Sequence, residues 1–98
     1  MDFHLEKRLS GIHGTGVVTR DFIPGGVVLY RVPMEYIVSK PLPGHVRIRN
    51  GQYVSDDVFL NWVNHSCNPN AALLPGRMPV IISLRDILFG EEITINYS

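Results

Sequence analysis

The sequence predicts a mostly-β domain, because of how its glycine, proline and β-branched residues are distributed. Nine glycines and seven prolines divide the 98 residues into short apolar segments. Several of these segments are rich in valine, isoleucine and threonine, which favour strands. The segments are too short for long helices, so we expect only one or two short helical turns.

The first half of the chain carries signals for two strands. Residues 14–23 run from two glycines into β-branched residues and predict a strand. Residues 24–26, Pro-Gly-Gly, predict a turn, and residues 27–32 predict a second strand. Residues 39–44 contain two prolines, which remove amide donors, and predict a loop.

A hairpin is the clearest local signal. Asn50-Gly51 suits a type I′ turn, so we expect residues 46–49 and 52–55 to pair as antiparallel strands. In this hairpin Val46 and Ile48 would face the core, while Arg47 and Arg49 would face solvent.

The second half alternates between apolar and polar segments. Asp56 and Asp57 can cap a short helix or 3₁₀ turn over residues 58–63, whose apolar side chains should be buried all round. The remaining segments predict a polar loop at 64–70, a buried strand at 79–84, a connection at 85–90 and an alternating strand at 92–97. Period two places Ile93, Ile95 and Tyr97 on one face of that last strand, with Thr94 and Asn96 on the other.

The composition is typical of a single domain, which we place at residues 1–98. Hydrophobic residues make up 45% of the chain, enough for a modest core. Nine basic residues balance nine acidic ones, which argues against nucleic acid as the main partner because phosphate binding needs a dense basic face. The N-terminus lacks the apolar segment of a signal peptide, and no apolar run approaches the roughly 20 residues of a membrane span. We therefore expect an intracellular location, cytoplasmic or nuclear, without a membrane partner.

Gly14 and Gly16 form a candidate ligand-binding turn. They do not make a dinucleotide-binding fingerprint, because Thr19 holds the third glycine position and a strand follows. On its own the pair is more often a simple β-turn. Its potential value is that missing side chains let a ligand approach the main chain closely.

His65 and Cys67 could act as base and nucleophile. They lie only two residues apart without a clear orienting partner, so we interpret Cys67 as a buried structural thiol. The four histidines share no metal-ligand spacing, and the single cysteine excludes a multi-cysteine zinc site, so we expect no metal.

Two pairs of adjacent carboxylates could serve acid–base chemistry, at positions 56–57 and 91–92. Such pairs are more often a solvated face or a helix cap, although acidic residues near a channel would favour a cationic substrate. Tyr97 ends the last strand on its apolar face, which by itself indicates a core tyrosine whose hydroxyl reaches solvent.

Taken in order, three segments resemble the SET domain family. The first is residues 11–26, with the glycine pair, a strand and the turn Ile23-Pro24-Gly25-Gly26. The second is residues 59–70, ending in Asn64-His65-Ser66-Cys67-Asn68-Pro69-Asn70. The third is residues 85–97, Arg-Asp-Ile-Leu-Phe-Gly-Glu-Glu-Ile-Thr-Ile-Asn-Tyr. The last two motifs are specific, and together the three span nearly the whole chain.

The resemblance implies a fold of small, mostly antiparallel sheets with a C-terminal pseudoknot. It also implies a protein-lysine N-methyltransferase that uses S-adenosylmethionine, with a histone or another protein or peptide as the lysine substrate. In that family Gly14, Thr15 and Gly16 would contact the methionine part of the cofactor through the main chain. Asn64 would hold its amino group, the backbone of His65 would bind adenine, and Tyr97 would be the catalytic residue beside the lysine channel.

The C-terminal end departs from many relatives. Only Ser98 follows Tyr97, whereas those relatives continue into a segment that completes the lysine channel and packs an aromatic residue on adenine. We expect that wall to come from a second copy in a homodimer or from chain beyond these residues. The alternative is a catalytically silent SET-like module for peptide binding or dimerisation.

Overall fold

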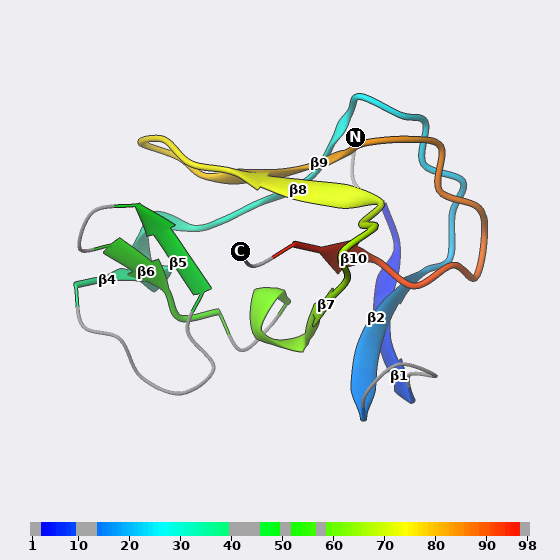
Figure 1. Cartoon of the computed structure of the whole chain (residues 1–98), viewed down its shortest axis with the longest axis horizontal. Helices are drawn as coiled ribbons and strands as arrows, with labels where there is room; N and C mark the ends of the chain where they lie inside the picture. Colours follow the sequence, from blue (N-terminus) through cyan, green and yellow to red (C-terminus); the bar gives the residue numbers. More distant parts are fainter. Residues whose placement is uncertain (1–2, 10–13, 40–45, 50–51, 57–58, 97–98) are drawn as a thin grey trace.

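The computed structural model describes residues 3–9, 14–39, 46–49, 52–56 and 59–96. Their strands are short, and two single 3₁₀ turns interrupt them (Figure 1). The strands are β1 (Leu5–Leu9), β2 (Thr15–Thr19), β3 (Val28–Arg31), β4 (Ile37–Val38), β5 (Val46–Arg49), β6 (Gln52–Val54), β7 (Asn64–His65), β8 (Ala71–Leu74), β9 (Val80–Ser83) and β10 (Thr94–Ile95), and the turns are η1 (Met34–Tyr36) and η2 (Leu60–Trp62). The mostly-β prediction is confirmed.

The described strands form four small sheets. Strands β1 and β2 pair antiparallel, and two three-stranded antiparallel sheets have the orders β3-β9-β8 and β4-β6-β5. The fourth sheet is a parallel pair of β7 and β10. Figure 1 shows β10 between β8 and β7, near the middle of the molecule. The predicted fold class of small, mostly antiparallel sheets is therefore confirmed.

Most of the predicted strands and the hairpin are present, although several are shorter than predicted. Strand β2 ends at Thr19, and Ile23 forms only an isolated bridge with Ile87. Strands β5 and β6 pair as predicted, with Arg47 exposed. The turn at 50–51, residues 40–44 of the predicted loop, and the side chains of residues 46, 48 and 49 lie outside the described residues.

Three strands were not predicted, and one predicted loop is partly wrong. Strand β1 consists of Leu-Glu-Lys-Arg-Leu and is half-buried or exposed throughout, so it lacks an apolar face that would mark it. Strands β4 and β8 also went unpredicted. Asn64 and His65, predicted as loop, form β7 because a partner far along the sequence, β10, pairs with them.

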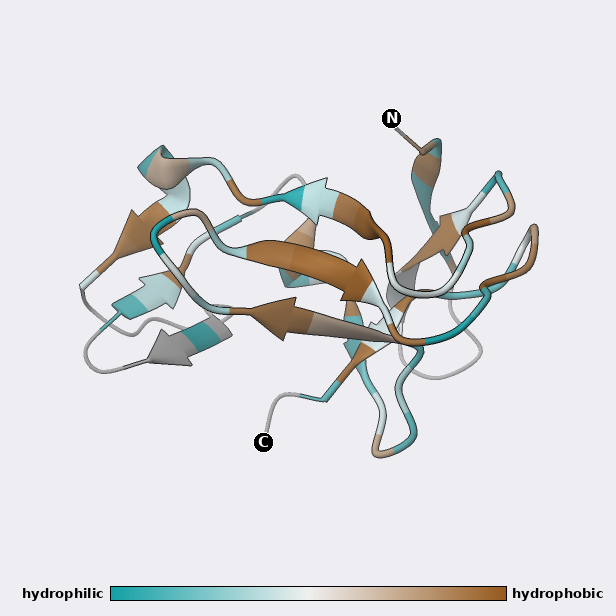
Figure 2. Cartoon of the chain, turned by 90° about the horizontal axis from the view of Figure 1, so that it is seen from above, coloured by the Kyte–Doolittle hydropathy of each residue, from teal (hydrophilic) through white to brown (hydrophobic). Residues whose placement is uncertain are grey.

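The hydrophobic core is formed mainly by aliphatic residues of β2, β3, β6, β8, β9, β10 and η2 and of the segments between them. Thirteen described hydrophobic residues are buried. Figure 2 shows that the neighbouring strands β8 and β9 are both largely apolar. The buried side chains include Val17 of β2, Leu60 of η2, Ile81 of β9 and Ile95 of β10. Ile23 and Ile87, which lie outside the named strands, exchange two backbone hydrogen bonds of 2.9 and 2.8 Å, and both are fully buried.

A buried aspartate organises the turn that precedes β7. The Asp56 carboxylate accepts hydrogen bonds from the Phe59 amide at 2.9 Å and from the Tyr30 hydroxyl at 2.6 Å. The Tyr30 ring stacks on Phe59, with centroids 4.2 Å apart. Asp56 therefore holds the residue that precedes η2, but the N-cap of η2 is Phe59 and has no side-chain cap, so the predicted cap by Asp56 is wrong in detail. Asp57 lies outside the described residues. The prediction of burial all round is wrong for Trp62, which is 37% exposed and carries the Lys7 ammonium over its ring at 4.6 Å.

The C-terminal segment is enclosed by earlier parts of the chain. The Ser66 amide donates to the Ile95 carbonyl at 2.9 Å, and Asn70 bonds to Thr94 on the other side. Ile93 and Ile95 are buried as predicted, but Thr94 is also buried. Thr94 lies on the face opposite Ile93 and Ile95, and Asn70 and β8 cover it there. Asn96 is exposed.

Candidate functional site

The glycine turn lies directly before β2, and its two glycines have different surroundings. Gly14 has φ +51°, the left-handed region that favours glycine, and a Cβ there would meet nothing within 4 Å. A Cβ on Gly16 would instead overlap the Glu92 carboxylate and lie 3.0 Å from Asn64 Nδ2. Open space for a ligand is therefore found at Gly14, while Gly16 makes room for side chains of the chain itself.

The Asn64 side chain links the glycine turn to the C-terminal segment. Its Nδ2 donates to the Thr15 carbonyl oxygen at 3.3 Å and to Glu92 Oε2 at 2.7 Å. Both partners can only accept, so the amide must turn its nitrogen towards them. Asn64 is half-buried in β7, beside Thr94 of β10. The structure thus brings together Thr15, Gly16 and Asn64, three of the residues predicted to bind the cofactor.

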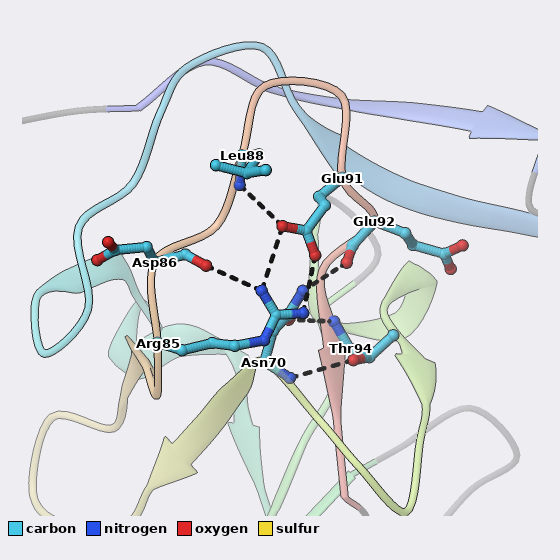
Figure 3. Close-up of polar contacts among 7 residues, drawn as sticks. All are labelled: Asn70, Arg85, Asp86, Leu88, Glu91, Glu92 and Thr94. Atoms are coloured by element: carbon cyan, nitrogen blue, oxygen red, sulfur yellow. Dashed lines mark hydrogen bonds and ion pairs between the residues drawn. The ribbon is translucent and has the colours of Figure 1, made fainter.

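Glu91 and Glu92 point to different parts of the molecule. Glu91 forms an ion pair with Arg85 at 2.8 Å and accepts from the Leu88 amide at 2.9 Å (Figure 3). The Arg85 hydrogen bond holds the pKa of Glu91 below its ordinary value. Figure 3 shows the Glu92 side chain directed away from this ion pair. The prediction of a solvated pair is wrong for Glu92, which is half-buried against Gly16 and Asn64.

His65 follows Asn64 in β7 and lies opposite Ile95 of β10. Its Nε2 lies 3.5 Å from the sulfur of Cys67, which is an exposed free thiol. The prediction of a buried structural thiol is wrong, because Cys67 lies in the exposed part of the turn between β7 and β8. Tyr97, the predicted catalytic residue, lies outside the described residues, directly after Asn96.

The groups gathered at this site suit a cation rather than an anion or a metal. The Thr15 carbonyl, the Asn64 amide and the Glu92 carboxylate supply acceptor oxygens, which an ammonium group can use. Gly14, two residues before Gly16, is exposed, and the space beside its Cα is open. Among the described residues, no three His, Cys, Asp or Glu side chains lie close enough together to hold a metal ion. The arrangement is therefore suited to an ammonium group.

Sequence reasoning missed Glu92 and Asn70 as parts of this region. Adjacent residues in an extended chain point to opposite sides, so Glu91 and Glu92 could not both face solvent beside a packed sheet. That rule was the available signal for Glu92. Asn70 binds Thr94 and the Glu92 carbonyl, and a local pattern gives no sign of such distant partners.

Comparisons with known proteins point to one family. The family described as SET domain matches residues 14–98. A curated relative, a histone-lysine N-methyltransferase SETMAR of Bos taurus, is 26% identical over 127 aligned positions that include the whole chain. The chain spans 42% of the length of that relative.

Solved structures share the fold. A Plasmodium falciparum protein described as a candidate histone methyltransferase has a TM-score of 0.77 at 17% identity, with 96% of this chain and 92% of that chain covered. The methyltransferase domain of human SETMAR has a TM-score of 0.72 at 21% identity, covering 98% of this chain and 45% of that one. KRYPTONITE, solved with mCHH DNA, an H3(1-15) peptide and SAH, has a TM-score of 0.78 at 19% identity, covering 98% of this chain and 23% of that one.

Proposed function

Because the chain belongs to the SET domain family, we propose that it is a protein-lysine N-methyltransferase that uses S-adenosylmethionine. The observation that carries the proposal is the convergence of Thr15, Asn64 and Glu92 around Gly16. These groups form an acceptor-rich corner of the kind that an amino-acid ammonium group needs. The curated relative is a histone-lysine methyltransferase, which supports methyl transfer at the level of the family.

S-adenosylmethionine supplies an electrophilic methyl group on a sulfonium. The attacking lysine amine must be neutral, yet a free lysine with a pKa of about 10.4 requires about 4.6 kcal/mol for deprotonation at pH 7. Main-chain groups at residues 14–16 and the Asn64 amide would fix the ligand, which aligns the reacting atoms. In this proposal the Tyr97 hydroxyl orients the amine, and the backbone of His65 binds adenine.

The substrate that we propose is a lysine in a histone or another intracellular protein. KRYPTONITE was solved with an H3 peptide, and a protein substrate of this kind would place the chain in the nucleus or cytoplasm. No helix among the described residues is long and apolar enough to cross a membrane. We propose no direct role for nucleic acid, because the nine basic and nine acidic residues cancel.

Cofactor binding and methyl transfer test the proposal separately. Calorimetric titration with S-adenosylmethionine should show one binding site, and radiolabelled transfer to histones, followed by mapping, should identify the modified lysine. Tyr97→Phe should lower turnover by at least a hundredfold while leaving cofactor affinity within about threefold. Failure of the protein to bind S-adenosylmethionine, with or without histone peptide, would refute the proposal.

A second candidate function is a silent module that associates with another copy of itself. The loops around the Ile23–Ile87 bridge carry four large apolar side chains, Phe22, Leu84, Leu88 and Phe89, each more than half exposed. Arg20, Asp21 and Asp86 border them with both signs of charge, which suits a self-complementary surface. Sedimentation analysis should then detect a dimer that Phe89→Asp abolishes. A monomer at 100 µM combined with methyl transfer would exclude this candidate.

A further inference from the structure

We infer that Glu92 is a positioning residue of the same site: it turns the Asn64 amide oxygen towards the ammonium group of the cofactor's amino-acid part and supplies a negative charge near that group. This inference rests on the proposed function, because it assigns a role toward S-adenosylmethionine. The contacts of Glu92 with Gly16 and Asn64 support it.

The position of Glu92 is fixed by its backbone. The Ile93 amide donates to the Val17 carbonyl at 2.7 Å, and Glu92 bridges Val18, so the C-terminal segment is attached to β2 just where Glu92 lies. The Glu92 carbonyl also accepts from Asn70 Nδ2 at 2.7 Å. These bonds hold the Glu92 main chain from two sides, and the carboxylate is therefore held near β2 rather than free in solvent.

The carboxylate lies over the Cα of Gly16. A Cβ at position 16 would overlap Glu92 Oε2, so every residue other than glycine would displace this carboxylate or the Asn64 amide. The missing side chain at position 16 and the acidic side chain at position 92 therefore match each other. Gly16 is required here by a charged group of the protein, which a simple β-turn would not explain.

The same carboxylate sets the orientation of Asn64. Glu92 Oε2 accepts from Asn64 Nδ2 at 2.7 Å, the shorter of the two bonds that this nitrogen makes. The amide oxygen is consequently turned away from Glu92 and Thr15. A ligand ammonium that donates to this oxygen would lie on the side of the amide away from Glu92 Oε2, and the negative charge of Glu92 would attract it across the width of the amide group.

Glu91 provides a matched control. It has the same side chain and the same charge, but its carboxylate pairs with Arg85 at 2.8 Å and points away from Gly16 and Asn64. Neutralising Glu91 changes the net charge of the chain as much as neutralising Glu92 does. A difference between the two variants therefore reports position rather than total charge.

The experiment measures affinity by calorimetry for two ligands that share the adenosine and thioether groups. S-adenosylhomocysteine carries the ammonium group, and 5′-methylthioadenosine lacks the whole amino-acid part. Glu92→Gln should weaken S-adenosylhomocysteine about tenfold and change 5′-methylthioadenosine less than twofold, while Glu91→Gln should change both less than twofold. Glu92→Asp keeps the charge and should restore part of the loss, which also serves if the Gln variant folds poorly.

The outcomes separate this inference from the proposed function. If the wild-type chain binds neither S-adenosylmethionine nor S-adenosylhomocysteine, the proposed function fails and the inference fails with it. If the wild-type chain binds both and Glu92→Gln binds S-adenosylhomocysteine equally well, only the role of Glu92 is overturned. An equal loss for both ligands would also overturn it, because the effect would then not depend on the ammonium group.

Discussion

Asn70 and Thr94 bond to each other in both directions across the interior of the domain. The backbone N–H of Asn70 donates to Thr94 Oγ1 at 3.3 Å, and the backbone N–H of Thr94 donates to the side-chain oxygen Asn70 Oδ1 at 2.9 Å (Figure 3). Both residues are buried. Because Asn70 Nδ2 also donates to the Glu92 carbonyl, one side chain attaches both Thr94 of β10 and Glu92, which precedes this strand.

We expect Asn70→Ala to destabilise the fold by about 2–4 kcal/mol. The substitution removes two buried side-chain hydrogen bonds and leaves the Thr94 amide and the Glu92 carbonyl without these partners, at about 1–3 kcal/mol for each. Urea unfolding measures the change, and Asn68→Ala is the control because Asn68 is exposed in the same turn. If both variants lose less than about 0.5 kcal/mol, Asn70 does not secure the C-terminal strand.

Gly16→Ala should be tolerated better when Glu92 is shortened. In the wild-type chain the new methyl group overlaps the end of the Glu92 side chain, which must move away from Asn64, and we expect a loss of about 1 kcal/mol. In a Glu92→Ala background the carboxylate is absent, so the same substitution should cost clearly less. A double-mutant cycle measured by urea unfolding gives the coupling between the two positions. Strict additivity would show that Gly16 and Glu92 do not compete for this space.

The fold class could be predicted from sequence because strand signals are local. The glycine pair predicted the start of β2, although β2 ends at Thr19 rather than at residue 23, and Asn50-Gly51 predicted the pairing of β5 with β6. Strand β1 was missed because its residues lack an apolar face, and β7 was missed because β10 stabilises it from a distant part of the sequence. Pairing between distant segments leaves no local pattern.

The site was predicted in part for the same reason. Motif resemblance identified Thr15, Gly16 and Asn64, which the fold does bring together. It did not distinguish Glu91 from Glu92, whose roles depend on which face of the last segment meets β2. The sequence motif therefore identified the C-terminal segment as part of the site. Only the packing of this segment against β2 shows that Glu92, rather than Glu91, reaches the site.

Tyr30→Phe should destabilise the protein most at neutral pH and less at alkaline pH. Burial, the hydrogen bond donated to Asp56 and the charge of Asp56 raise the pKa of Tyr30 well above its ordinary value of about 10. A raised pKa in the folded state contributes stability below the ordinary pKa, and this contribution is lost as the pH rises through the shifted value. The variant also removes one donor from the buried Asp56 carboxylate, which should cost about 1–3 kcal/mol at pH 8.

Urea unfolding of Tyr30→Phe and wild-type protein between pH 8 and pH 11.5 checks this sign. The gap between the two should narrow above about pH 10, where the unfolded wild-type chain begins to release the Tyr30 proton. Tyr53→Phe removes one tyrosine from the titration of the unfolded chain and is the control. A gap that stays constant or widens with pH would contradict the raised pKa of Tyr30.

Cys67 should react with thiol reagents in the folded protein. It is exposed, so a disulfide reagent needs no unfolding to reach the sulfur, and we expect a native rate within about tenfold of the rate in urea. A buried thiol in a protein with an unfolding free energy of at least about 5 kcal/mol would react more than a thousandfold more slowly. Cys67→Ser should correspondingly change the unfolding free energy by less than about 0.5 kcal/mol. Strong protection of the thiol in the native state would contradict the prediction and mean that the turn between β7 and β8 is covered in the folded protein.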